Sequence, residues 1–116
     1  MYQLNYAEVQ SDSAADSKER ERALLQRSIE LLKKAKQDGP RSFATVEAVH
    51  FLNRLWSSLL EDLASSQNEL PKELRASLIS IGLWILRECE AVRVGESDNV
   101  DGLIEISQII ADSLKP

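Results

Sequence analysis

Apolar residues recur every three or four positions along most of the chain, which is the spacing of an amphipathic α-helix. Short polar stretches interrupt this pattern at three places. We therefore predict four helices joined by short loops, at approximately residues 13–37, 42–63, 71–93 and 98–114. No strand pair and no internal repeat is evident, so the predicted fold is all-α, a small four-helix bundle.

Residues with strong helix-ending or helix-starting tendencies stand at the boundaries of these segments. Gly39 and Pro40 end the first segment, and Ser42 is a suitable N-cap for the second. Pro71 suits the first turn of the third helix, and Gly95 marks its end. Either Asp98 or Asn99 can cap the fourth helix.

The first residues follow a different pattern. Tyr2, Leu4 and Tyr6 alternate with polar residues, and a period of two is typical of an extended segment. We expect residues 1–12 to form an extended N-terminal arm beside a bundle domain of residues 13–116. The arm either docks on the bundle, where Tyr2, Leu4 and Tyr6 would regulate access to a binding surface, or is mobile.

The third segment carries more apolar residues than one core-facing stripe requires. That stripe comprises Leu74, Leu78, Ile81, Gly82, Ile85, Cys89 and Val92. Four further apolar residues widen the apolar arc to about 260°: Ile79, Leu83, Trp84 and Leu86. Either the other three helices cover this surplus or a partner protein does. Gly82 is either a helix defect or, as we prefer, a point where another helix approaches closely.

If a partner covers the surplus, the predicted protein-binding residues are the four surplus residues and two aromatic residues of the second segment. The set is Ile79, Leu83, Trp84, Leu86, Trp56 and Phe51.

Charge narrows the range of partners. The 116-residue chain has a formal net charge of −5, and its lysines and arginines are dispersed among acids. Direct nucleic-acid binding is disfavoured, because such binding depends largely on basic residues that neutralise phosphates. The longest apolar run, residues 78–86, is less than half of the roughly 20 residues that a membrane span needs. The chain has a single cysteine, and its N-terminal residues lack the features of a signal peptide. We therefore expect a cytoplasmic protein.

Residues that could support catalysis or metal binding are few. The single histidine, His50, falls on the polar face of its helix, and Cys89 falls on an apolar stripe. Zinc sites need about four ligands, so we expect no metal, no cofactor and no enzyme activity. Glu61 and Asp62, near the carboxyl end of the second helix, are either solvated or faced by a cation such as Arg75 or Arg87.

Several longer phrases resemble one protein family along almost the whole chain. They are YQLNYAEV from Tyr2, GPRS from Gly39, FLNRLWSSLLEDLA from Phe51, LPKELRASLISIGLWILRECE from Leu70 and GLIEI from Gly102. In their order and spacing the chain resembles the FlaF family of flagellar biosynthesis regulators of alphaproteobacteria. Cys89 departs from the alanine expected there.

The resemblance implies a protein that controls flagellin production and export, binds flagellin as a secretion chaperone and acts alongside the regulator FlbT. The terminal segments of flagellin are amphipathic and prone to aggregate before assembly. A small acidic bundle with surplus apolar surface could shield them.

Two other functions stay open. The protein could regulate translation by contacting flagellin messenger RNA, directly or through FlbT, although its charge argues against direct contact. Alternatively, the surplus apolar surface could form a homodimer.

Overall fold

A computed structural model describes the backbone of residues 6–114 and the side chains of residues 16–114. This part of the chain forms four helices and no strand: α1 (Tyr6–Asp38), α2 (Phe43–Ala64), α3 (Lys72–Arg93) and α4 (Val100–Ser113). The predicted all-α four-helix fold is confirmed, and α2, α3 and α4 begin and end close to the predicted positions.

The first helix begins earlier than predicted. Residues 6–12 belong to α1, so the expected extended arm does not reach as far as residue 12, and Tyr6 is the first residue of the helix. Tyr2 and Leu4 lie outside the described residues. The physical reason is that Ala, Glu and Gln are frequent between Tyr6 and Ala15 and no Gly or Pro occurs before Gly39. Nothing local therefore stops the helix from extending toward the N-terminus.

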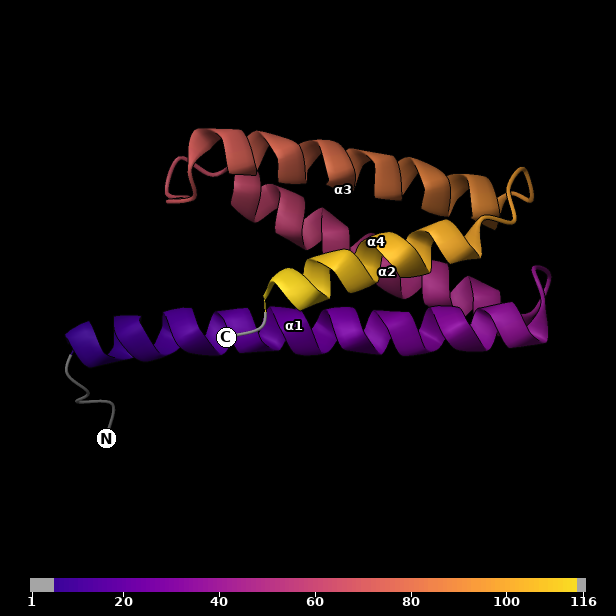
Figure 1. Ribbon diagram of the computed structural model, residues 1–116, viewed down its shortest axis with the longest axis horizontal. Helices are drawn as coiled ribbons and strands as arrows, with labels where there is room; N and C mark the ends of the chain where they lie inside the picture. Colours follow the sequence, from indigo (N-terminus) through magenta and orange to yellow (C-terminus); the bar gives the residue numbers. More distant parts are fainter. Residues whose placement is uncertain (1–5, 115–116) are drawn as a thin grey trace.

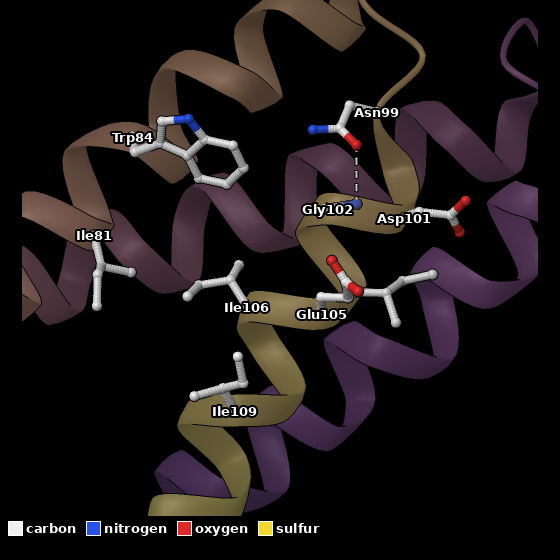
Figure 2. Close-up of a pocket in the computed structure, with 9 residues that line it drawn as sticks. Ile81, Trp84, Asn99, Asp101, Gly102, Glu105, Ile106 and Ile109 are labelled. Carbon is white, nitrogen blue, oxygen red and sulfur yellow. Dashed lines mark hydrogen bonds between the residues drawn. The ribbon is translucent and has the colours of Figure 1, made fainter.

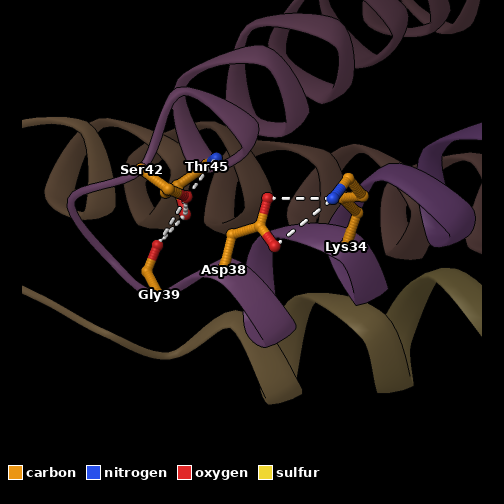
Figure 3. Close-up of polar contacts among 5 residues, drawn as sticks. All are labelled: Lys34, Asp38, Gly39, Ser42 and Thr45. Carbon is orange, nitrogen blue, oxygen red and sulfur yellow. Dashed lines mark hydrogen bonds and ion pairs between the residues drawn. The ribbon is translucent and has the colours of Figure 1, made fainter.

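The turn between α1 and α2 is closed by a compact hydrogen-bond network (Figure 3). Gly39 adopts a positive φ of 102°, and its N–H donates to the carbonyl of Ala35 at 2.9 Å, a common way to end a helix. The Ser42 side chain accepts from the Thr45 N–H at 3.2 Å, which confirms Ser42 as the N-cap of α2. The Thr45 hydroxyl donates back to the Gly39 carbonyl at 2.7 Å, so this turn is fixed from both sides.

The connection between α3 and α4 is also defined by its sequence signals. Gly95 has a φ of 82°, and the N–H groups of Gly95 and Glu96 donate to the carbonyls of Val92 and Ala91. This pair of bonds is a Schellman motif, which ends α3 where the glycine predicts. Asn99 caps α4 by accepting from the Gly102 N–H at 3.0 Å.

The helices do not surround one central helix. In Figure 1, α1 and α3 lie on opposite sides, α4 crosses in front between them and α2 crosses behind. The closely packed pairs are α1 with α2, α2 with α3 and α1 with α4, whereas α3 and α4 touch only sparsely. The core takes side chains from all four helices. Its fully buried large side chains include Leu25, Leu32, Leu52, Trp56, Ile85 and Leu103.

This arrangement leaves α3 less covered than the apolar stripe predicts. Only Gly82, Ile85, Cys89 and Val92 of α3 are buried. Leu74, predicted to lie in the core, is 47% exposed, and Leu78 and Ile81 are only half-buried. The core prediction is wrong for Leu74, whereas Leu78 and Ile81 are partly buried and pack against the core. The reason is that α3 packs mainly on α2, so part of its apolar arc has no close neighbour among the described residues.

Gly82 lies where α3 approaches α2 closely. A Cβ atom added at Gly82 would lie 2.8 Å from Trp56 Cε3 and 2.8 Å from Leu60 Cδ2. Real Cβ atoms do not approach other atoms so closely. The prediction of close helix approach at Gly82 is confirmed, and the glycine is what lets α3 lie directly over the ring of Trp56.

Candidate protein-binding groove

An apolar groove lies between α3 and α4, where these two helices diverge. We call it the seam groove, and its volume is about 750 Å³. Its apolar side chains come from both helices: Ile81, Trp84, Ile104, Ile106 and Ile109. Figure 2 shows Ile81 and Trp84 of α3 facing Ile106 and Ile109 of α4 across the gap. The seam groove is open to solvent and is lined by large hydrophobic side chains.

Helical spacing places these side chains on the two walls. Ile81 and Trp84 stand three residues apart on α3, and Ile106 and Ile109 stand three apart on α4, so each pair projects from one helix face. Trp84 is 36% exposed and Ile109 is 62% exposed. Two large apolar side chains at this degree of exposure, on facing helices, are typical of an interaction surface.

The α4 wall is held in position at its start. A Cβ atom at Gly102 would lie 2.5 Å from Asn99 Nδ2, so the glycine makes room for the Asn99 cap (Figure 2). Lys36 of α1 forms an ion pair of 2.8 Å with Asp101, which connects α4 to α1. Asp101 and Glu105 both line the seam groove and give this wall an acidic edge.

The structure separates the six predicted binding residues into different environments. Trp84 lines the seam groove, and Leu83 is 46% exposed on α3 but outside the groove lining. Ile79 is half-buried, and Leu86 and Phe51 are partly buried and pack against the core.

Trp56 requires a correction, because it is 1% exposed and belongs to the core. Its helix packs against both α1 and α3, and Gly82 of α3 lies against the ring. Trp56 therefore offers almost no surface to a partner in this conformation.

The sequence interpretation missed the α4 side of the groove. Ile109 lies among the polar positions of α4, away from the side chains that pack into the core, and it is the most exposed large hydrophobic residue of the groove. An isolated isoleucine on an otherwise polar helix face was the available signal.

The surroundings of His50 and Cys89 do not favour a catalytic role for either side chain. His50 and Cys89 line the same small cavity of about 280 Å³, but the Cys89 side chain is 2% exposed and no hydrogen bond joins these two described side chains. Burial, with a smaller contribution from Glu88, raises the pKa of Cys89 to about 12, so the reactive thiolate is disfavoured. Among residues 16–114, no group of three His, Cys, Asp or Glu side chains is arranged to hold a metal ion.

None of the helices in the described part of the chain is both long and apolar enough to cross a membrane.

Comparison with known families provides an independent result. A family model described as "Flagellar protein FlaF" matches residues 2–114, which is nearly the whole chain. No match to a curated protein or to a solved structure was found. Because the match covers far more than half of the sequence, the chain belongs to the FlaF family of flagellar proteins.

Proposed function

We propose that this flagellar protein is a non-enzymatic cytoplasmic regulator that binds flagellin as an export chaperone and thereby controls flagellin synthesis and secretion. The observation that carries the proposal is the seam groove, which is open and apolar and has Trp84 and Ile109 exposed on facing helices. FlaF family membership supports the flagellar context.

The shape and chemistry of the groove suit an amphipathic helix. Helix-in-groove binding lays the apolar face of one helix between the side chains of two others. The terminal segments of flagellin, which are amphipathic before assembly, have this character. Covering the exposed part of Ile109 would contribute up to about 2 kcal/mol, and Trp84 a comparable amount. Both residues are therefore expected to dominate the binding free energy, as buried aromatic and aliphatic anchors commonly do.

Titration of purified flagellin monomer into the protein, followed by calorimetry, tests the proposal. Trp84→Ala and Ile109→Asp should each weaken binding by about 10-fold or more, because each removes an apolar contact in the middle of the groove. Phe43→Ala is the matched control, since Phe43 is 78% exposed but lies at the start of α2, outside the groove. Its affinity for flagellin should equal that of the unmodified protein.

Equal flagellin affinity in all three folded variants would show that the seam groove is not the binding site. Loss of binding on Leu83→Asp alone would move the site to the flank of α3, outside the groove.

Three companion measurements address the alternatives. Light scattering shows whether the exposed apolar surface instead joins two copies of the chain. A gel shift with flagellin leader RNA at physiological salt shows whether regulation involves direct RNA contact. Regulation through a protein such as FlbT is compatible with a chaperone and would be detected by co-purification.

A further inference from the structure

A second apolar opening lies at the end of the molecule where α2 turns into α3. We call it the end cleft, and its volume is about 440 Å³. Leucines of α2, of the connecting loop and of α3 form one side of it: Leu59, Leu63, Leu70, Leu74 and Leu78. Apolar residues of α1, α2 and α4 line the rest: Leu25, Trp56, Ile110 and Leu114. Leu70 is 39% exposed and Leu74 is 47% exposed, so the cleft presents apolar side chains that the described chain covers only in part. It shares no lining residue with the seam groove.

Two carboxylates stand on the rim of this apolar cleft, Glu21 of α1 and Asp62 of α2. Burial raises the pKa of Glu21, and the nearby negative charge of Asp62 raises it further, against a smaller opposing effect of Arg20. Lys18 lies on the same rim, yet among the described side chains no ion pair joins a lysine or arginine to either carboxylate. The cation that Glu61 and Asp62 were expected to attract, Arg75 or Arg87, is likewise not paired with them.

Asp62 is contacted by an uncharged side chain. Its neighbour is Asn68, whose side-chain amide donates to the Asp62 carbonyl at 3.2 Å and approaches the Asp62 carboxylate at 3.5 Å. These contacts close the last turn of α2 without neutralising its charge. Glu21 and Asp62 therefore repel each other beside an apolar surface, and no ion pair among the described side chains neutralises either of them, which favours an incoming cation.

The backbone of the walls restricts the form of a protein occupant. The cleft is built largely from helices, whose main-chain groups already bond within the helix, so the walls offer few backbone partners to an extended strand. A helix satisfies its own backbone and needs only side-chain contacts.

From the leucine walls and the two unpaired carboxylates, we propose that the end cleft binds an amphipathic helix of a partner protein whose apolar face carries an arginine or lysine at its edge. The leucines receive the apolar side chains, and the cation sits between Glu21 and Asp62. The site is separate from the seam groove, and so it does not depend on flagellin binding there.

Designed peptides provide the probe. Three blocked peptides of about 15 residues, long enough to form a helix on binding, share leucines at positions i, i+4 and i+7. They differ at one adjacent position, which is Arg, Gln or Glu. The Arg peptide should bind about 10-fold more tightly than the Gln peptide, and the Glu peptide should bind most weakly, because only the cation neutralises the rim.

Variants of the protein locate the effect. Glu21→Gln combined with Asp62→Asn should reduce the affinity for the Arg peptide to that for the Gln peptide, while leaving the Gln peptide unchanged. Leu74→Ser should weaken binding of both peptides. Glu105→Gln, which removes a carboxylate from the seam groove, is the matched control and should change neither affinity. Amide chemical shifts in the presence of the Arg peptide should move at Leu63, Leu70 and Leu74.

Several outcomes would overturn the proposal. They are equal affinities for the three peptides, no saturable binding of the Arg peptide, or shifts confined to Ile104 and Ile109. A dimer in light scattering that Leu74→Ser dissociates would assign the cleft to a second copy of the chain instead. None of these results would alter the expected effects of Trp84→Ala and Ile109→Asp on flagellin, so the two proposals fail independently.

Discussion

α2 and α3 have the same length, 22 residues, and both are rich in apolar residues, yet α2 buries eight residues and α3 buries four. The difference follows from their neighbours. α2 packs closely against both α1 and α3, whereas α3 packs closely against α2 alone. Apolar content by itself therefore does not make a helix central. A helix with one close neighbour keeps part of its apolar arc available, and both the seam groove and the end cleft include residues of α3.

One tryptophan on each helix shows the same contrast. Trp56 of α2 is 1% exposed, and Trp84 of α3 is 36% exposed. The first fills the core below Gly82, and the second stands at the side of the seam groove. The same type of side chain thus stabilises the fold at Trp56 and is available to a partner at Trp84.

The largest expected effect on stability comes from replacing one of these two tryptophans by alanine. Trp56→Ala should lower the free energy of unfolding by about 3–5 kcal/mol, because it removes a fully buried aromatic ring and leaves a cavity. Trp84→Ala should lower it by less, about 1–2 kcal/mol, since 36% of the residue is already exposed to water. Urea denaturation followed by circular dichroism measures both changes.

Fluorescence of the milder Phe variants provides a control that does not depend on stability. With Trp84→Phe, the emission of the remaining Trp56 should be blue-shifted and resistant to quenching by iodide. With Trp56→Phe, the emission of Trp84 should be red-shifted and readily quenched. Similar stability losses for the two Ala variants would contradict the difference between α2 and α3.

A smaller effect is expected at the contact that holds α3 onto α2. Gly82→Ala should lower the free energy of unfolding by about 1 kcal/mol, because overpacking against Trp56 and Leu60 outweighs the better helix propensity of alanine. Ser80→Ala, at an exposed position of the same helix, is the control and should change stability by less than about 0.5 kcal/mol. A stabilising Gly82→Ala would mean that the two helices separate there without loss.

The smallest effect concerns pH and the rim of the end cleft. The folded-state pKa of Glu21 lies above its ordinary value of 4.5, so the folded protein binds the proton more tightly than the unfolded chain does. Its stabilising contribution is complete below pH 4.5 and is lost as pH rises through the raised pKa. Glu21→Gln should thus equal the parent protein at pH 4 and exceed its stability at pH 7, by up to about 0.5 kcal/mol.

Urea denaturation at both pH values measures this change. Glu105→Gln is the control, because it removes a carboxylate that is exposed. Asp62→Asn should reduce the pH dependence, because it removes the neighbouring charge. An advantage of Glu21→Gln that is larger at pH 4 than at pH 7 would contradict the assigned direction of the pKa.

Local signals predicted much of the fold. The cap at Ser42, the helix end at Gly95 and the close approach at Gly82 were all readable, because each depends on the conformation or size of one residue. The start of α1 was not, since the alternation of Tyr2, Leu4 and Tyr6 competed with good helix formers that follow. Of the candidate binding residues, Trp84 lines the seam groove and Trp56 is buried. Ile109 also lines the seam groove but was not among the candidates.

The sequence by itself determined four amphipathic helices, most of their ends and the direction that each apolar stripe faces relative to its own axis. Only the tertiary structure decided which stripes are covered. A helical periodicity defines an angle around one helix, but burial depends on how many other helices lie at that angle and how closely they approach. For α3 that number is small, and the apolar run from Leu78 to Leu86 is therefore part core and part open surface.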